Sequence, residues 1–231
     1  MRCIKLRGLP FLLIVFCLAL LMSPRAKAEK EGEKNVCFRW AFGAMVGPED
    51  DRRLVAITDD TTLKTGNKLK LLVEPQNKCF VYLIYHSGQD DVLMLFPYDL
   101  DQFSKDYQTS KKYFIPQGTM WFELDEKVGL ETFYLLASAT RLVELEALFE
   151  KHKSEGAIGK QKRAKQILTQ IHKIKRRYGK LTTDAERPVS IGGSVRGSKK
   201  VKELALPDFY TTATEVSAHN FYSRTFTIEH Q

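Results

Sequence analysis

The stretch that decides the fold runs from Lys68 to Pro97 and reads KLKLLVEPQNKCFVYLIYHSGQDDVLMLFP. It contains three apolar runs, at 68–74, 79–86 and 92–96, divided by a Pro-Gln-Asn-Lys turn and a Ser-Gly-Gln-Asp-Asp turn. Short runs rich in Val, Ile, Tyr, Phe and Leu between such turns are typical of antiparallel strands. The segment therefore predicts three consecutive strands.

The first two runs differ in which of their faces is apolar. In 68–74 the leucine and valine side chains alternate with Lys68 and Lys70, so we expect a half-exposed strand. In 79–86 both faces are apolar, which indicates a sheet covered on two sides. Because a sandwich meets that requirement, the sequence predicts a mainly β protein, an antiparallel β-sandwich of about eight strands.

Further strand patterns lie on both sides of this segment. Val36–Phe42 alternates, with Val36, Phe38, Trp40 and Phe42 on one face, and Glu131–Ala137 is rich in strand-forming residues. Weaker patterns cover 113–115 and 121–124, and we expect the last strand at 221–228.

After Ala137 the period of the apolar residues becomes helical. Leucine and phenylalanine recur at helical spacing from Thr140 to Lys153, and a second helical pattern follows a Gly-containing break and reaches Tyr178. Gly179 then predicts the end of the helix. We therefore expect an inserted αα-hairpin at 140–180 before the last strand, followed by a Gly/Ser/Arg-rich loop at 182–206.

Residues 1–28 have the three parts of a signal peptide. A basic n-region is followed by an apolar core, Leu9–Met22, and by an Ala-Lys-Ala cleavage site that ends at Ala28. The core is shorter than the roughly 20 residues that span a bilayer, and no later apolar stretch approaches that length. We expect cleavage after Ala28, a periplasmic or secreted product without a transmembrane segment, and a single domain at 29–231. An uncleaved N-terminal anchor is the alternative.

Charge is distributed unevenly along the chain. The net charge is +8, but five positive charges lie in 1–28, which leaves +3 for 29–231. Residues 151–180 hold eleven Lys and Arg against a single Glu, a net charge of +10, so the rest of 29–231 carries −7. The sequence thus predicts a basic helical hairpin on an acidic β body.

This asymmetry is the strongest functional signal in the residues. We expect the hairpin to contact an acidic protein or an anionic envelope component, and export argues against nucleic acid as the partner. The alternative is a solvated polar face opposite an apolar stripe that packs on the sheet. The candidate binding residues are Lys160, Lys162, Arg163, Lys165, Lys173, Lys175, Arg176 and Arg177.

Two cysteines, Cys37 and Cys79, remain after removal of 1–28. Thiols in an oxidising compartment pair if the fold brings them together, so a Cys37–Cys79 disulfide is one expectation. Two buried, unpaired thiols that pack as small apolar groups are the alternative. Neither a C-x-x-C motif nor closely spaced histidines occur, so we expect no metal site and no cofactor.

No catalytic motif is complete. Gly192–Lys199 approaches a phosphate-binding loop and a nucleophile elbow, but Ser198 replaces the lysine of the first and Arg196 the second glycine of the other. We interpret this segment as a surface loop and predict that the protein is not an enzyme. A hydrolase that uses Ser194 or an unrecognised carboxylate is the weakest hypothesis.

A small-ligand or glycan-binding sandwich is the second functional hypothesis. Aromatic side chains beside loops can supply stacking surfaces for sugars or other small ligands. The candidates for this role are Tyr85, His86, Tyr98, Tyr107 and Trp121.

Five short motifs between Leu54 and Ser138 carry a family resemblance. They are Leu63–Leu69, Cys79–Ile84, Leu93–Pro97, Phe114–Pro116 and Gly129–Phe133. With the closing strand near 221–230, they resemble a bacterial family known as domain of unknown function number 4384. The resemblance implies a compact extracytoplasmic β domain that acts as a non-catalytic binding or regulatory module. The basic hairpin departs from the family pattern.

Overall fold

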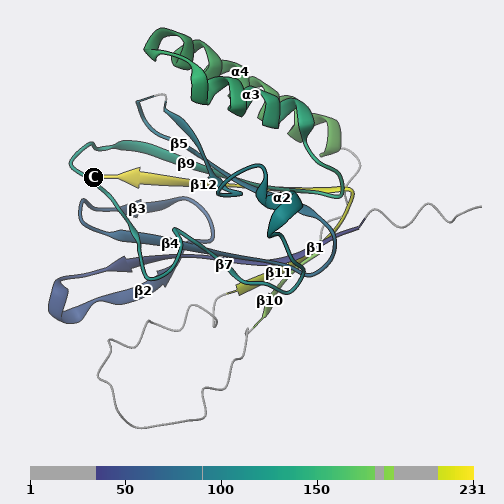
Figure 1. The fold of residues 1–231 in the computed structure, drawn as a ribbon. Coiled ribbons are helices and arrows are strands. Elements are labelled where there is room, and N and C mark those ends of the chain that lie inside the picture. The colour runs from purple at the N-terminus through teal and green to yellow at the C-terminus, as the bar shows by residue number, and fades with distance from the viewer. Residues whose placement is uncertain (1–34, 90, 180–184, 190–212) are drawn as a thin grey trace, which may run out of the picture. The chain divides into compact units, whose positions relative to one another are not determined.

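Two β-sheets lie face to face, and a pair of helices covers the outer face of one of them (Figure 1). The computed structural model describes residues 35–89, 91–179, 185–189 and 213–231. The expected signal peptide, 1–28, lies outside these residues.

The larger sheet has seven strands. Its order is β10 (Ala185–Val189), β11 (Ala213–His219), β1 (Asn35–Val46), β4 (Lys68–Pro75) and β7 (Tyr113–Ile115), while β2 (Arg53–Ala56) pairs with β1 and β8 (Phe122–Glu123) with β4. All of its pairs are antiparallel.

The smaller sheet has five strands and carries the helices. Its order is β3 (Thr61–Leu63), β12 (Phe221–His230), β9 (Gly129–Ser138), β5 (Phe80–His86) and β6 (Val92–Phe96). Only the β3–β12 pair in it is parallel. The helices are η2 (Glu49–Asp51), α2 (Gln102–Lys105), α3 (Val143–Ser154) and α4 (Ala157–Tyr178).

The predicted mainly β, antiparallel sandwich is confirmed, and so is the αα-hairpin. The described residues form twelve strands where about eight were expected. Strands β2 and β3, of four and three residues, are among those that the sequence analysis did not predict.

Part of the predicted 182–206 loop is a strand. Of that stretch the structure describes 185–189, which form β10 and pair with β11, so two strands separate the hairpin from β12. The prediction failed because β10 reads AERPV and four of its five residues are exposed, as suits a strand at a sheet edge.

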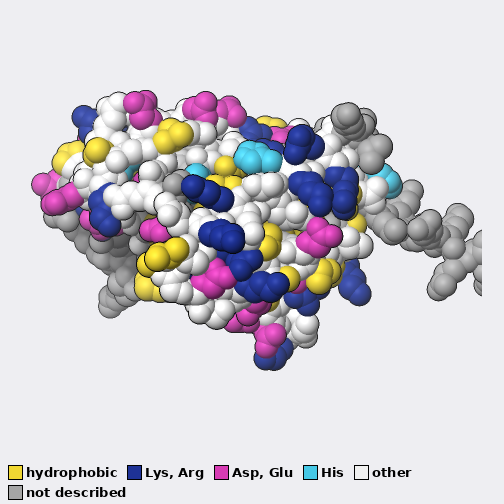
Figure 2. All heavy atoms as spheres, turned by 90° about the horizontal axis from the view of Figure 1, so that it is seen from above, with side chains coloured by type: hydrophobic (Ala, Val, Ile, Leu, Met, Phe, Trp, Pro, Cys, Tyr) yellow, Lys and Arg dark blue, Asp and Glu magenta, His cyan; other side chains and the backbone are white. Residues whose placement is uncertain are grey.

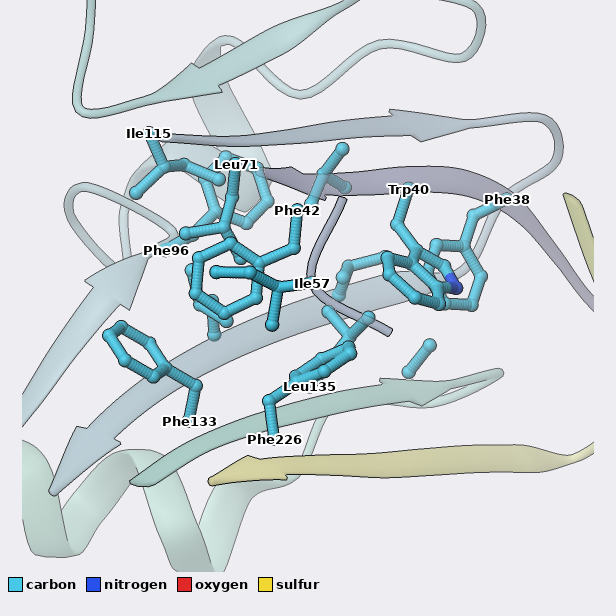
Figure 3. Close-up of a cluster of buried hydrophobic side chains, with 14 of the residues drawn as sticks. Phe38, Trp40, Phe42, Ile57, Leu71, Phe96, Ile115, Phe133, Leu135 and Phe226 are labelled. Atoms are coloured by element: carbon cyan, nitrogen blue, oxygen red, sulfur yellow. The ribbon is translucent and has the colours of Figure 1, made fainter. Parts of the chain in front are cut away.

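The core lies between the two sheets. The four alternating residues of β1 named above all point into it, as predicted. There they meet aromatic rings of the smaller sheet: Phe42 packs edge-on against Phe133 at 5.0 Å, and Trp40 against Phe226 at 5.0 Å (Figure 3). Aromatic pairs at this spacing add stability beyond the area they bury.

The two apolar faces of β5 are covered by different parts of the protein. Val81 and Leu83 point into the core between the sheets, whereas Tyr82 and Ile84 point outward and lie under the helices. The second cover of this strand is therefore the helical hairpin.

The outer face of β4 is buried, contrary to the half-exposed strand that was predicted. Lys70 is only 3% exposed, and its Nζ donates hydrogen bonds to the carbonyl oxygens of Gly118 (2.6 Å) and Met120 (2.7 Å). The same ammonium lies near the rings of Phe114 and Trp121. The carbonyl oxygens and rings of this part of the chain therefore replace the water that would otherwise solvate the ammonium.

Candidate binding surface on the helical hairpin

Helices α3 and α4 pack on the outer face of the smaller sheet through an apolar layer. The buried side chains that form this layer are Leu145 and Phe149 of α3, Ala164, Ile167, Ile171 and Ile174 of α4, and Tyr82, Ile84, Tyr134, Leu136 and Phe221 of the sheet. The two helices therefore dock on the sheet through their apolar faces.

Polar contacts fix the start of α3 to the sheet. Glu146, only 5% exposed, accepts a hydrogen bond from the Tyr82 hydroxyl at 2.6 Å and pairs with Arg141 at 2.7 Å. The Tyr82 oxygen accepts in turn from the Leu142 backbone N–H at 3.0 Å. Burial, and secondarily the bond to Glu146, raises the pKa of Tyr82, so its hydroxyl keeps its proton.

Contacts near its C-terminal end fix α4 to the same sheet. Tyr178 stacks on Phe221 with ring centroids 4.8 Å apart, and the Lys175 Nζ donates a 2.7 Å hydrogen bond to the Thr225 hydroxyl. Lys175 also lies over the ring of Tyr134, and burial lowers its pKa. Lys175, one of the predicted binding residues, therefore helps to dock the helix.

The opposite face of α4 is exposed and basic. Positions three and four apart share one face of a helix, so Lys162, Lys165, Lys173 and Arg176 form one row, which we call the basic stripe. All four side chains are exposed, and they extend over about 21 Å of helix axis at 1.5 Å per residue. Figure 2, which looks down on the helices, shows Lys and Arg gathered over the middle and right of this face, with some Asp and Glu among them.

The other predicted binding residues divide into two groups. Arg177 is exposed beside the stripe, whereas Lys160 is exposed on the opposite side of the first turn of α4, where it lines a hollow with Asp91 and His152. Arg163 is half-buried and forms an ion pair with Glu155, in the turn between the helices. The structure thus places six of the eight predicted residues on the surface, and turns Arg163 and Lys175 toward partners within the protein.

The β body does not neutralise this surface. Helix α4 carries eight basic and no acidic residues, and among the described residues no sheet carboxylate forms an ion pair with any of the eight. Body carboxylates pair instead with body arginines: Glu215 with Arg39 and Arg187, and Glu186 with Arg224. On α3, by contrast, the Nζ of Lys153 lies 3.9 Å from the carboxylate of Asp99 in the β body.

The aromatic platform of the glycan hypothesis is not assembled. An open groove of about 660 Å³ lies beside α2, and of the five candidates only Tyr98 lines it. Tyr107 is packed against the core and stacks on Tyr113, the Tyr85 hydroxyl donates to Glu131, and Trp121 lies beside Lys70. These rings are occupied in packing and hydrogen bonding.

The predicted Cys37–Cys79 disulfide is wrong for this structure, in which both thiols are free. Alternation along β1 turns Cys37 to the outer face, where its Sγ lies 3.8 Å from the Ser217 hydroxyl. Cys79 points into the core among apolar side chains, and its Sγ lies 3.6 Å from the Cys37 carbonyl oxygen. The two backbones are close, but the side chains point in different directions.

The remaining chemical candidates add no site. Across 35–89, 91–179, 185–189 and 213–231, no group of three or more His, Cys, Asp or Glu residues could hold a metal ion. In the same ranges no helix is both long and apolar enough to cross a membrane. Gly192–Lys199, with Ser194, lies outside the described residues.

The fold and this surface define a three-layer β-sandwich domain with a basic helix as its outermost element. Residues 62–141 match the model of the protein family described as Domain of unknown function (DUF4384), which confirms the resemblance found in the sequence. No curated protein and no solved structure matches the chain. The matched segment runs from within β3 to the residues just before α3, so α4 lies beyond it.

Proposed function

We propose that the protein is an exported, non-enzymatic binding or adaptor module, which contacts an acidic protein or an anionic envelope surface through α4. The observation that supports this is the row of exposed basic side chains without carboxylate partners in the described β body. Uncompensated charge of one sign on a rigid helix raises the local potential and attracts polyanions.

The energy available is sufficient for reversible binding. Each basic residue close to an anionic surface contributes about 1 kcal/mol, and the contribution falls off within a Debye length of about 8 Å at physiological salt. The four residues of the basic stripe, with Arg177 beside them, therefore supply enough for a salt-sensitive association.

A charge-reversal experiment tests the surface. In the test variant the four residues of the basic stripe become glutamate. The matched control carries the same total charge change at four exposed basic residues outside α4: Arg53, Lys64, Lys78 and Lys127. Retention on a heparin or polyglutamate resin is measured against a salt gradient, with circular dichroism as a check on folding.

We expect the stripe variant to lose retention and the control to keep most of it. Equal losses in both variants would mean that only net charge matters, and would overturn the assignment to α4. Export is tested separately by mass spectrometry of the protein from the cell envelope. An N-terminus at Glu29 supports it, and an intact Met1 contradicts it.

A further inference from the structure

The basic stripe continues into an exposed aliphatic side chain. Ile158 is 90% exposed, the highest value among the large hydrophobic residues whose exposure the structure describes. It lies in the first turn of α4, four residues before Lys162 and seven before Lys165, which puts it on the same face of the helix. The outward face thus combines a row of cations with one apolar group at its end.

The surroundings of Ile158 leave this side chain free to project. Gly156 and Ala157, which precede it at the tip of the hairpin, are small and exposed. The acidic residue of the tip, Glu155, is neutralised by Arg163. On α3, Glu144 accepts a hydrogen bond from Gln170 and Glu150 pairs with Lys153. The carboxylates of the tip and of α3 are therefore engaged, and the exposed Asp91, in the turn between β5 and β6, lines one hollow with Ile158 and Lys160.

We propose that the partner of α4 is an anionic lipid bilayer, with the basic stripe against the headgroups and Ile158 inserted at the acyl boundary. This deepens the proposed function and rests on it. A soluble polyanion pairs with the cations but gives no reason for an aliphatic side chain in full contact with water. A bilayer offers negative headgroups and, a few ångströms deeper, an apolar layer.

The docking of the hairpin determines how this contact is made. The apolar face of α4 stays buried on the sheet, so the helix lies on the membrane through its polar face without leaving the domain. Binding is then peripheral and reversible, and most of the attraction is electrostatic. Ile158 provides the part of the attraction that salt does not screen.

Vesicle sedimentation tests the inference with the full chain. The probes are vesicles of phosphatidylcholine alone and vesicles with 30% phosphatidylglycerol. The variants are Ile158→Ser, the stripe reversal and, as a matched control, Val143→Ser, which removes an aliphatic side chain that is 67% exposed outside the stripe. Binding is measured at low and at high salt.

We expect binding to the anionic vesicles only, with a loss of at least about 600-fold for the stripe reversal, since each of the four basic residues contributes about a fivefold factor. Ile158→Ser should weaken binding about tenfold, as expected for one aliphatic side chain removed from the apolar layer. Val143→Ser should leave it unchanged.

The outcomes separate this inference from the proposed function. If the protein is retained on heparin through the stripe but ignores anionic vesicles, the proposed function stands and the bilayer is overturned. If the protein binds anionic vesicles and the Ile158→Ser variant binds them as strongly as the Val143→Ser variant does, insertion of Ile158 is overturned. If the stripe reversal changes neither heparin retention nor vesicle binding, both proposals fail.

Discussion

The Tyr82 hydroxyl in β5 and the Glu146 carboxylate in α3 form a buried 2.6 Å hydrogen bond between the sheet and the helical layer. Glu146 lies beside Leu145 on the buried side of α3, so a carboxylate occupies a place where an apolar residue would be expected. It is held there by Tyr82 and Arg141. This polar contact helps to hold the hairpin on the sheet, and the hairpin carries the candidate surface on α4.

Replacing this carboxylate should loosen the hairpin. Glu146→Leu leaves the Tyr82 hydroxyl without its acceptor and Arg141 without its partner, and we expect a loss of about 2–3 kcal/mol in the free energy of unfolding. Glu146→Gln keeps an acceptor for the hydroxyl and should cost less. Urea denaturation followed by circular dichroism measures both. Glu150→Leu, at an exposed position of α3, is the control, and an equal loss there would contradict the role of Glu146.

The buried thiol of Cys79 should make stability fall at alkaline pH. Burial raises the pKa of Cys79 to about 12, against an ordinary value of about 8.5 in the unfolded chain. Between these values the unfolded state has released a proton that the native state keeps, so the free energy of unfolding falls as pH rises. The contribution of the thiol is fully present below about pH 8.5.

Urea midpoints from pH 8 to pH 10 test this. Lys70 and Lys175, whose pKa values burial lowers, act in the opposite direction over this range, so the comparison with Cys79→Ala is essential. We expect the wild type to lose up to about 1.4 kcal/mol per pH unit more than the variant. Parallel pH profiles would show that the thiol titrates normally.

Thiol chemistry should distinguish the two cysteines. Cys37 is half-exposed and should react with iodoacetamide in the native protein, whereas Cys79, buried in the core, should react only after denaturation. Peptide mapping without reductant should find no Cys37–Cys79 linkage. A disulfide-linked peptide pair would show that the side chains of the two strands can reorient toward each other.

Two lysines of one strand should differ sharply in their effect on stability. Lys70→Met keeps most of the side-chain volume but removes the buried ammonium, so two carbonyl oxygens lose their hydrogen-bond donor. We expect a loss of about 2–3 kcal/mol in the free energy of unfolding. Lys68→Met, on the same face of β4, removes a partly exposed ion pair with Glu123 and should cost less than about 1 kcal/mol. Thermal or urea unfolding of both variants gives the comparison, and equal costs would contradict the burial of Lys70.

Some tertiary features had a signal in the sequence that could have been used. If Val36 and Phe38 face the core, period-two alternation already puts Cys37 on the opposite face, which argues against the disulfide. Glu146 likewise falls between buried Leu145 and Phe149 at helical spacing, which marks it as a polar residue that needs a partner. Its partner, Tyr82, is 64 residues away and could not be identified in the same way.

The sequence by itself determined the features that depend on local period and composition. These are the strands at 36–42, 79–86 and 131–137, the two helices of the hairpin, and the excess of positive charge on the second of them. Only the tertiary structure decided that the hairpin covers β5, that Lys70 is buried, and that 185–189 is a strand. The physical reason is that periodicity records which face of an element avoids water, whereas the surface that covers that face comes from residues distant in the chain.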